Sequence, residues 1–484
     1  MTVEGRRYTG IGGAGRRSFG GDGPTAAVLT AVAGLVLVGF FAVAAAGGPD
    51  VWVPVLVVAV LAAISVPICS ATAGRPIDPR LRRILLVAFA LKMACAFPRY
   101  AMNEVAYDGA ADAGMYHEAG QTFRENGGRG NWSFDGAFIE RFPDETRSVG
   151  YVVGALYVVT GASQMTGYLV FSWISWLGLV FVFRAFRLGF PNAPPYLAAG
   201  LIFFLPSTLY WPSSIGKDAV MVFAIGLVTL GISRLMSGER SLLGLAWMGI
   251  GGLAMLQIRP HLLLIALVGG AASMIATRPG LERTRHPLAV RLVLLAALVP
   301  ALAFGLGRMD DVFGAPSDGD SFSVSGALDR TAQRSEVGGS AFETQPVSSP
   351  LDLPAASVNV VFRPFLFEAR NLASLVTALE GTALLLGAVV GARWLWRAGP
   401  AMARSPLAAY CGAFTLAFVI AFSNVGNAGI LARQRVQMFP LLLVVVAAAA
   451  EHRRLNATAV AADRNPDLDL TAISTLDPRL VSTP

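Results

Sequence analysis

Long apolar segments separated by short polar turns dominate the pattern of this chain. A crossing of about 30 Å of hydrocarbon needs about 20 residues in a helix, and many segments reach that length. They are residues 25–47, 51–72, 83–101, 166–184, 194–211, 217–236, 242–257, 260–277, 288–306, 371–392, 405–424 and 434–450. The run 149–163 is shorter, so we expect an interfacial or re-entrant helix there, the alternative being one more tilted crossing. The pattern predicts an all-α, polytopic transmembrane bundle of about 12–13 crossings.

Two long polar segments interrupt the apolar pattern and divide the chain. Residues 102–148 carry nine acids against four arginines, and residues 307–370 carry nine acids against five. The second segment contains Gly338-Gly339-Ser340, which predicts a mobile lid. The expected organisation is a disordered tail 1–24, membrane helices 25–101, loop 102–165, membrane helices 166–306, loop 307–370, membrane helices 371–451 and a disordered tail 452–484.

Composition narrows the class of protein. Of 484 residues, 54% are hydrophobic and only 14% are charged, which excludes a soluble enzyme with a single core. The net charge of +7 comes mainly from arginines in short turns between apolar runs, so we expect a lipid bilayer and no nucleic acid as partner. The three cysteines lie inside apolar runs and predict neither a disulfide nor a zinc site.

The arginines also predict how the chain is oriented. Cytoplasmic turns of membrane proteins are enriched in Lys and Arg. Several turns here are arginine-rich, namely those with Arg75, Arg80, Arg82 and Arg83, with Arg278, Arg283, Arg285 and Arg291, with Arg393, Arg397 and Arg404, and with Arg453 and Arg454. We therefore expect a multi-pass membrane protein with both termini in the cytoplasm and both acidic loops on the extracytoplasmic face.

The first acidic loop holds the first group of candidate site residues. In a helix, Asp108, Asp112 and Tyr116 are four residues apart and share one face, with His117 and Glu118 beside them. The alternative is an ordinary solvated helix, because charged residues normally lie in water.

A second group consists of basic residues that the predicted topology places on the same outer face. They are Lys217, Arg259, His261, Arg363, Arg433 and Arg435. A single arginine there often extends to lipid headgroups. Several from separate parts of the chain indicate a site for an anion, and guanidinium groups bind phosphate oxygens in pairs. Lys92 and Glu380 lie inside apolar runs, where they either pair with each other, find separate partners or contribute to carrier binding.

With these motifs the sequence resembles the GT-C superfamily of integral-membrane glycosyltransferases, which use polyprenyl-phosphate sugars. The matching features are the acid and tyrosine segment from Asp108 to Glu118, the short apolar run before Gly161, the turn from Leu205-Pro206-Ser207 to Lys217-Asp218, and the arginine-rich last outer turn. It also resembles uncharacterised bacterial membrane proteins with similar Arg-Pro-His and Arg-Gln-Arg turns, which implies a bacterial cytoplasmic (inner) membrane as its location.

The resemblance implies a GT-C-like fold and an inverting sugar transfer outside the membrane. Asp112 would be the general base, with Asp108 tuning it or helping to hold a divalent cation such as Mg or Mn. The basic residues would bind the donor phosphate, and Tyr116, His117 and Glu118 would contact the sugar or the glycan or lipid acceptor. A lipid-linked oligosaccharide polymerase, a transporter or flippase of lipid-linked saccharides, and a scaffold without chemistry are the alternatives. Transporters bind at depth between broken helices.

Overall fold

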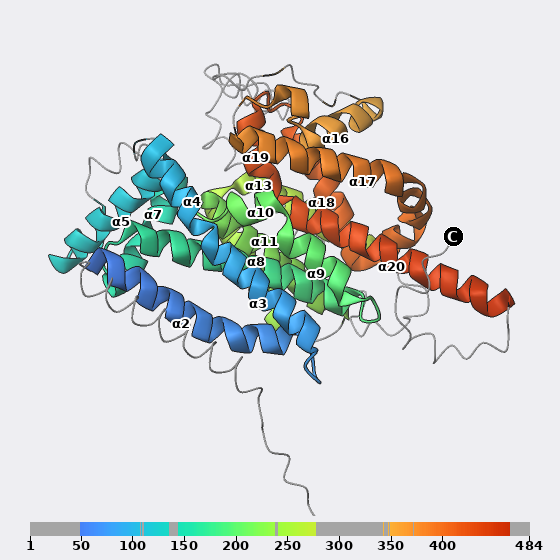
Figure 1. The fold of residues 1–484 in the computed structure, drawn as a ribbon, viewed down its shortest axis with the longest axis horizontal. Coiled ribbons are helices and arrows are strands. Elements are labelled where there is room, and N and C mark those ends of the chain that lie inside the picture. Colours follow the sequence, from blue (N-terminus) through green and yellow to red (C-terminus); the bar gives the residue numbers. More distant parts are fainter. Residues whose placement is uncertain are drawn as a thin grey trace, which may run out of the picture.

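The fold is taken from a computed structural model that describes residues 49–106, 108, 111–134, 144–237, 241–276, 342, 347, 349–370 and 372–464. Within these ranges every regular element is a helix (Figure 1), as the apolar pattern predicts. The predicted tail 1–24, the spans 25–47 and 288–306, and most of the loop 307–370, including Gly338-Gly339-Ser340, lie outside the described residues.

Several described helices are long and apolar enough to cross a membrane. These five are α2 (Pro49–Thr72), α3 (Pro79–Ala94) with its continuation α4 (Ala96–Ala101), α8 (Gln164–Gly189), α11 (Lys217–Ser237) and α17 (Leu372–Ala403). A sixth is possible if α19 (Ala428–Gln434) and α20 (Phe439–Arg464), which meet at a bend of 58°, form one broken span. The described part is therefore that of a multi-pass membrane protein.

Shorter helices complete the bundle. Those of 10 to 18 residues are α9 (Pro195–Phe204), α12 (Ser241–Ile258), α13 (Pro260–Ile275), α16 (Leu353–Phe362) and α18 (Pro406–Phe422). The one-turn helix α10 (Pro206–Tyr210) follows α9, and a π-helical turn (Met102–Ala106) follows α4. Two more helices, α5 (Asp112–Gly128) and α7 (Asp144–Thr160), come from the first acidic segment.

Glycines allow the central helices α8, α11 and α12 to pack closely. A Cβ atom on Gly178 of α8 would clash with the backbone of α11 at Val222, and one on Gly226 of α11 would clash with the backbone at Gly178. On the other side of α11, a Cβ atom on Gly231 would lie 2.6 Å from the carbonyl oxygen of Gly244 in α12. Small residues bring helix backbones together where there is little hydrophobic gain in lipid. They place α11 at the centre of the bundle.

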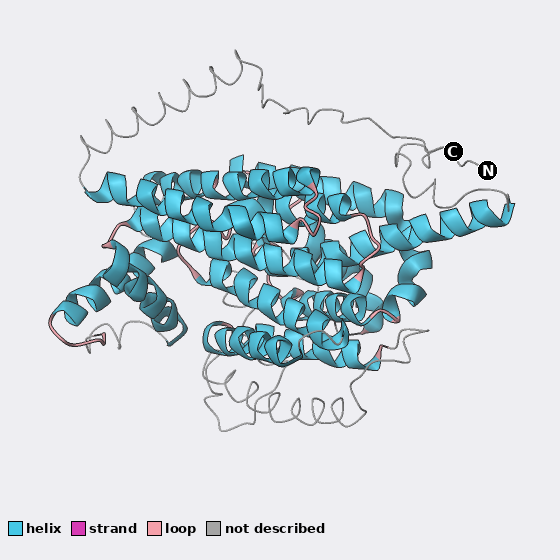
Figure 2. Ribbon diagram, turned by 90° about the horizontal axis from the view of Figure 1, so that it is seen from below, coloured by secondary structure: helices cyan, strands magenta, loops and turns pink. Residues whose placement is uncertain are grey.

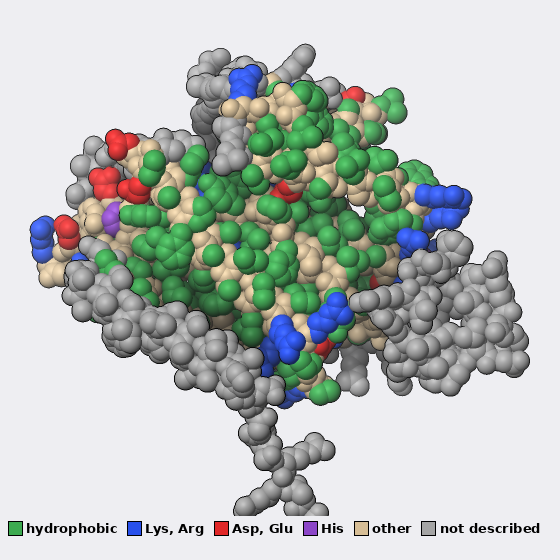
Figure 3. All heavy atoms as spheres, in the orientation of Figure 1, with side chains coloured by type: hydrophobic (Ala, Val, Ile, Leu, Met, Phe, Trp, Pro, Cys, Tyr) green, Lys and Arg blue, Asp and Glu red, His purple; other side chains and the backbone are tan. Residues whose placement is uncertain are grey.

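The bundle has two chemically different ends. At one end, the arginine end, the α2–α3 turn meets the start of α9, where Tyr196 donates a 2.7 Å hydrogen bond to Asp78. Arg454 of α20 reaches the carbonyl oxygen of Asn192 there, at 3.4 Å. At the other end, the α5 end, lie the starts of α5, α11 and α13 together with α19. Figure 3 shows acidic side chains gathered over the region of α5, whereas several Lys and Arg side chains lie toward the opposite side of the molecule.

Helices α5 and α7 pack against each other at one end of the bundle (Figures 1 and 2). The ring of Phe123 in α5 contacts those of Trp132, Phe134 and Tyr151. Gly154 of α7 lies directly against the Phe123 side chain. This aromatic cluster joins the second half of α5 to α7.

The structure differs from the predicted elements at several places. The expected span 194–211 is broken at Leu205 into α9 and α10, because Pro206 removes a backbone donor and disfavours helical geometry in the residue before it. The run 149–163 is helical as expected over most of its length, as the second part of the 17-residue α7, which packs on α5, and its place relative to the membrane stays a prediction. Residues 452–464, expected to be part of a disordered tail, instead continue α20.

Candidate functional site

An ion pair joins the first acidic segment to α19, which holds the arginine-rich turn near the end of the chain. Asp112 is the first residue of α5, and its carboxylate lies 2.6 Å from Nη1 of Arg433 in α19. The helix α19 is oriented by Asn427, whose side chain accepts hydrogen bonds from the amides of Gly429 and Ile430 at 2.9 and 3.1 Å. The side chains of Asp112 and Arg433 are 46% and 28% exposed, so the pair is open to solutes.

Beneath this pair lies a second carboxylate, that of Asp218 in the first turn of α11. It is only 5% exposed and accepts from Nε of Arg433 and, at 2.9 Å, from Nη2 of Arg259. A buried carboxylate is stable only when cations and hydrogen bonds replace its water. Asp218 therefore holds both arginines in place.

Glutamines complete the connections on the side of α19. Arg259, in the turn between α12 and α13, donates from Nη1 to Oε1 of Gln434 at 2.7 Å. Gln437 donates to Gln434 at 3.0 Å and reaches Asp218 at 3.4 Å. We call Asp112, Asp218, Arg259, Arg433, Gln434 and Gln437 the Asp218 cluster. Its two carboxylates balance its two guanidinium groups, and four separate chain segments meet in it.

The predicted face of α5 is only partly present. Helix α5 begins at Asp112, so Tyr116 follows it on the same face, but Asp108 precedes the helix in a turn with a φ of 48°. Asp108 is exposed, and no ion pair joins it to another described residue. Tyr116 is buried beside the cluster; burial raises its pKa well above the usual value, and the Asp112 carboxylate adds to the rise. Its hydroxyl therefore stays protonated.

The other two residues of that segment face away from the cluster. His117 shares a 2.7 Å hydrogen bond between its Nδ1 and the hydroxyl of Tyr157 in α7. Burial raises the pKa of Tyr157, so this phenol too stays neutral. Glu118 is exposed. His117 thus helps to join α5 to α7, and a role in binding a sugar or acceptor stays a prediction for these residues.

The remaining predicted phosphate ligands are spread over the same end. Lys217 begins α11 and interacts electrostatically with His261, whose ring packs on Phe422 at 5.8 Å between centroids. Arg363 is paired with Glu368, with Nη2 at 2.5 Å from the carboxylate, and its guanidinium lies 3.9 Å from the ring centre of Phe342.

Arg435 is fully buried and does not reach the surface. It donates to the carbonyl oxygens of Val361, at 3.1 Å, and of Arg363, both at the end of α16. Carbonyl groups at a helix end lack intrahelical partners and attract cations. Arg435 therefore anchors α16 to the turn after α19. The sequence does not show that this arginine is buried, so it does not reveal this structural role.

The two ionisable residues expected inside the bundle do not pair with each other. Nζ of Lys92 donates to the carbonyl oxygens of Thr208 and Leu209 at 2.7 and 3.1 Å, at the end of α10. The carboxylate of Glu380 accepts from the amide of Ser207, at the start of α10, at 2.6 Å. We call Lys92, Glu380 and α10 the α10 clamp. Its negative group lies at the helix start and its positive group at the helix end, which complements the helix dipole.

Sequence reasoning did not select Asp218, Gln434, Gln437 or Arg99 as site residues. The position of Asp218, directly after Lys217 at the predicted outer end of a span, could have indicated a site residue. Arg99 of α4 lies over the rings of Tyr210 and Trp211, at 5.0 and 5.2 Å, and reaches Ser214 at 3.4 Å. Its signal was an arginine in the last turn of an outward-running span.

The described residues do not form a ligand set for a metal. No group of three or more His, Cys, Asp or Glu side chains converges within the described ranges. Both carboxylates of the Asp218 cluster already bind guanidinium groups. The guanidinium groups of Arg259 and Arg433 are hydrogen-bond donors, which suit an anion rather than a divalent cation.

Comparison with known proteins adds no relative. No protein-family model, curated protein or solved structure matches this chain. The groups of the Asp218 cluster are therefore what indicates the chemistry of this chain. The cluster offers one partly exposed carboxylate, one partly exposed guanidinium beside it, and a buried acid that fixes the distance between them.

Proposed function

We propose that this chain is an integral-membrane glycosyltransferase that moves a sugar from a polyprenyl-phosphate carrier to an envelope glycan or lipid acceptor on the extracytoplasmic face. One observation supports the proposal above the others. Asp112, Arg433 and Arg259, which come from distant segments of the chain, meet in a single cluster at the acidic end of the bundle.

In the proposed reaction Asp112 is the general base. Its carboxylate takes the proton of an acceptor hydroxyl, and that oxygen forms a bond to the anomeric carbon of the donor sugar. The bond between that carbon and the phosphate oxygen breaks, and polyprenyl phosphate leaves with the electron pair. The configuration at the anomeric carbon is inverted because attack and departure occur on opposite faces.

Arg433 is the proposed contact to the departing phosphate. Its Nε and Nη1 bind Asp218 and Asp112, whereas within the described residues its Nη2 has no carboxylate partner. A fixed guanidinium beside a growing negative charge stabilises the transition state without reorganising. Arg259 is more deeply buried and uses both terminal nitrogens on Asp218 and Gln434, so it orients Arg433 through Asp218 rather than touching the donor.

Transport of a lipid-linked saccharide is the second candidate, because α9 and α10 form a broken helix with buried charges nearby. In transporters such a break leaves helix ends free to bind the substrate. Here Glu380 and Lys92 already bind the two ends of α10. The broken helix is therefore better explained as a fixed part of the bundle. A polymerase of lipid-linked units would use the same cluster for the same bond chemistry.

The test is turnover of a panel of polyprenyl-phosphate hexoses and pentoses by the purified chain in liposomes, measured as released polyprenyl phosphate. We expect Asp112→Asn to reduce turnover by about 100-fold or more, the usual contribution of a general base. Glu125→Gln, an exposed acid of the same helix, is the matched control and should keep full turnover. Full turnover by Asp112→Asn would rule out the proposed base.

A measurement of donor binding distinguishes the proposed role of Arg433 from that of Asp112. We expect Arg433→Gln to weaken binding of the polyprenyl-phosphate donor about 10-fold, because a charged hydrogen bond to phosphate is lost. Asp112→Asn should leave donor binding nearly unchanged. Equal donor affinity of Arg433→Gln and the parent protein would contradict the phosphate contact, and movement of intact donor across the liposome without turnover would favour transport.

A further inference from the structure

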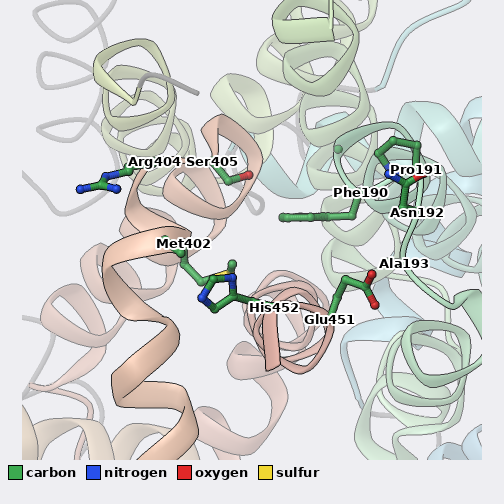
Figure 4. Close-up of a pocket in the computed structure, with 11 residues that line it drawn as sticks. Phe190, Pro191, Asn192, Ala193, Met402, Arg404, Ser405, Glu451 and His452 are labelled. Atoms are coloured by element: carbon green, nitrogen blue, oxygen red, sulfur yellow. The ribbon is translucent and has the colours of Figure 1, made fainter. Parts of the chain in front are cut away.

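A cavity of about 270 Å³ opens at the arginine end, far along the bundle from the Asp218 cluster. It lies where the α8–α9 turn, the α17–α18 turn and α20 come together (Figure 4). Its main lining residues are Phe190, Asn192, Met402, Ser405, Glu451 and His452. The proposed sugar transfer uses none of these residues.

Ser405 is the unusual polar group of this cavity. It occupies the N-cap position of α18, but its side chain makes no capping hydrogen bond. The residue is only 7% exposed, and among the described residues its hydroxyl has no hydrogen-bond partner. Figure 4 shows the hydroxyl pointing into the space beside Phe190. A buried hydroxyl without a partner is costly, so a ligand oxygen is the natural partner here.

The start of α18 follows Ser405 directly, although its first amides are not part of the cavity lining. Pro406 occupies the first helical position and has no amide hydrogen, and the first helical bond runs from the amide of Ala409 to the carbonyl oxygen of Ser405. The amides of Leu407 and Ala408 therefore have no partner within the helix. A 17-residue helix also carries a partial positive charge at its start. Together with the Ser405 hydroxyl, these groups favour a negatively charged ligand.

The charges around the cavity allow an anion to enter. The carboxylate of Glu451 is bound by Arg454, with Nε and Nη2 at 3.0 and 3.1 Å, so its negative charge is offset. Arg404 is exposed, and its guanidinium points away from the cavity in Figure 4, so it adds positive potential at the rim without a direct contact. Phe190 and Met402 give the cavity an apolar wall, which a free inorganic ion would not use.

We propose that this cavity binds the phosphate group of a glycerophospholipid from the membrane leaflet at the arginine end. The phosphate oxygens accept from the Ser405 hydroxyl in the positive potential at the start of α18, and the glycerol and the first acyl carbons lie against Phe190 and Met402. The site is independent of the proposed sugar transfer.

The test is native mass spectrometry of the full chain released from nanodiscs that contain equal amounts of phosphatidylglycerol and digalactosyldiacylglycerol, a bilayer lipid without phosphate. We expect the parent protein to retain phosphatidylglycerol in preference. Ser405→Ala should lower this retention about 10-fold or more, as expected for one hydrogen bond to a charged acceptor. Ser70→Ala is the control, because that serine lies at the same end and already bonds to the carbonyl oxygen of Val66 at 2.9 Å.

A second variant and a competitor decide the remaining outcomes. Ala401→Leu adds bulk to the cavity lining and should also reduce retention of phosphatidylglycerol, even if Ser405→Ala proves unstable. Equal retention of the two lipids, or unchanged retention in both variants, would overturn the site. Displacement by inorganic phosphate as effective as that by short-chain phosphatidylglycerol would overturn the assignment to a lipid.

Discussion

The Asp218 cluster and the α10 clamp are two ways in which this bundle accommodates buried charge. In the cluster, carboxylates bind guanidinium groups from other segments, and the outermost pair is half exposed at Asp112. In the clamp, Lys92 and Glu380 bind only the backbone of one short helix, and both are buried. The cluster can exchange a partner for a ligand, whereas the clamp cannot do so without freeing the ends of α10.

The two groups therefore differ in access: the cluster has an edge that solutes can reach, whereas the clamp is enclosed. A buried ion is tolerated when its hydrogen bonds are satisfied, whether by opposite charge or by helix ends. Only a group that stays accessible can then act on a substrate. Both groups are unusual in the sequence for the same reason, and exposure in the folded chain is what distinguishes them.

The largest effect is expected when the cluster loses its central acid. Asp218→Ala leaves the guanidinium groups of Arg259 and Arg433 together without a buried counter-charge, and breaking a buried pair in this way costs about 3–5 kcal/mol. We expect a large loss of stability in an SDS unfolding titration of the detergent-solubilised protein. Glu125→Ala, an exposed acid in α5, is the control. A stability equal to that of the parent would mean that Asp218 does not hold the two arginines.

The second-largest loss of stability is expected when the α10 clamp loses Lys92. Lys92→Met keeps the length of the side chain but leaves the carbonyl groups of Thr208 and Leu209 without their donor, at a cost of about 2 kcal/mol. The same unfolding titration measures it, with Arg83→Met, an exposed site on α3, for comparison. Because the clamp is structural, turnover of donor per folded molecule should not change. A selective loss of turnover would show that the clamp, like the cluster, contributes to activity.

Gln437, a neutral residue of the cluster, should contribute less to stability than its charged residues do. Gln437→Leu removes the weak contact to Asp218 and the 3.0 Å hydrogen bond to Gln434. Asp218 keeps both guanidinium partners, so we expect a loss of only about 1 kcal/mol in the free energy of unfolding. A loss as large as that of Asp218→Ala would show that the glutamines, not the arginines, hold the carboxylate.

The smallest effect is expected at the exposed edge of the cluster. A double-mutant cycle of Asp112→Asn and Arg433→Gln should give a coupling free energy of about 0.5 kcal/mol, because a half-exposed pair is weakened by water. The coupling should fall further at high salt, which screens exposed charges but not buried ones. A coupling that is large and independent of salt would indicate that the pair is closed to solutes, and would weaken the case for a substrate site.

Much of the fold followed from apolar run length. The predicted spans 51–72 and 217–236 correspond closely to α2 and α11, which are long enough to cross a membrane. The runs 242–257 and 405–424 correspond to α12 and α18, which are apolar but shorter, so the described part holds five or six candidate spans and not every predicted crossing. The break at Leu205 has a local cause in Pro206, but run length alone merges α9 and α10 into one span. The bend of 58° between α19 and α20 likewise has no signal in hydropathy.

The candidate site was predictable in part. Sorting charges by membrane side selected Asp112, Arg259 and Arg433, and the structure brings these three together, while their roles stay predictions. The same sorting selected Arg435 and Arg363, which bind a helix end and Glu368 instead. It placed Asp218 on the same face beside Lys217 but gave it no role, because which cations an acid binds depends on how the helices pack.

The sequence by itself determined that this is a helical, multi-pass membrane chain with acids gathered at one end and arginines at the other, because hydropathy and charge act locally along each segment. Only the tertiary structure decided which charges meet. Asp112 and Arg433 are far apart in the sequence, and their contact depends on how α5, α11 and α19 pack. Packing also decided that Lys92 and Glu380 hold α10 rather than each other, since a buried ion binds whichever partner the surrounding helices place within reach.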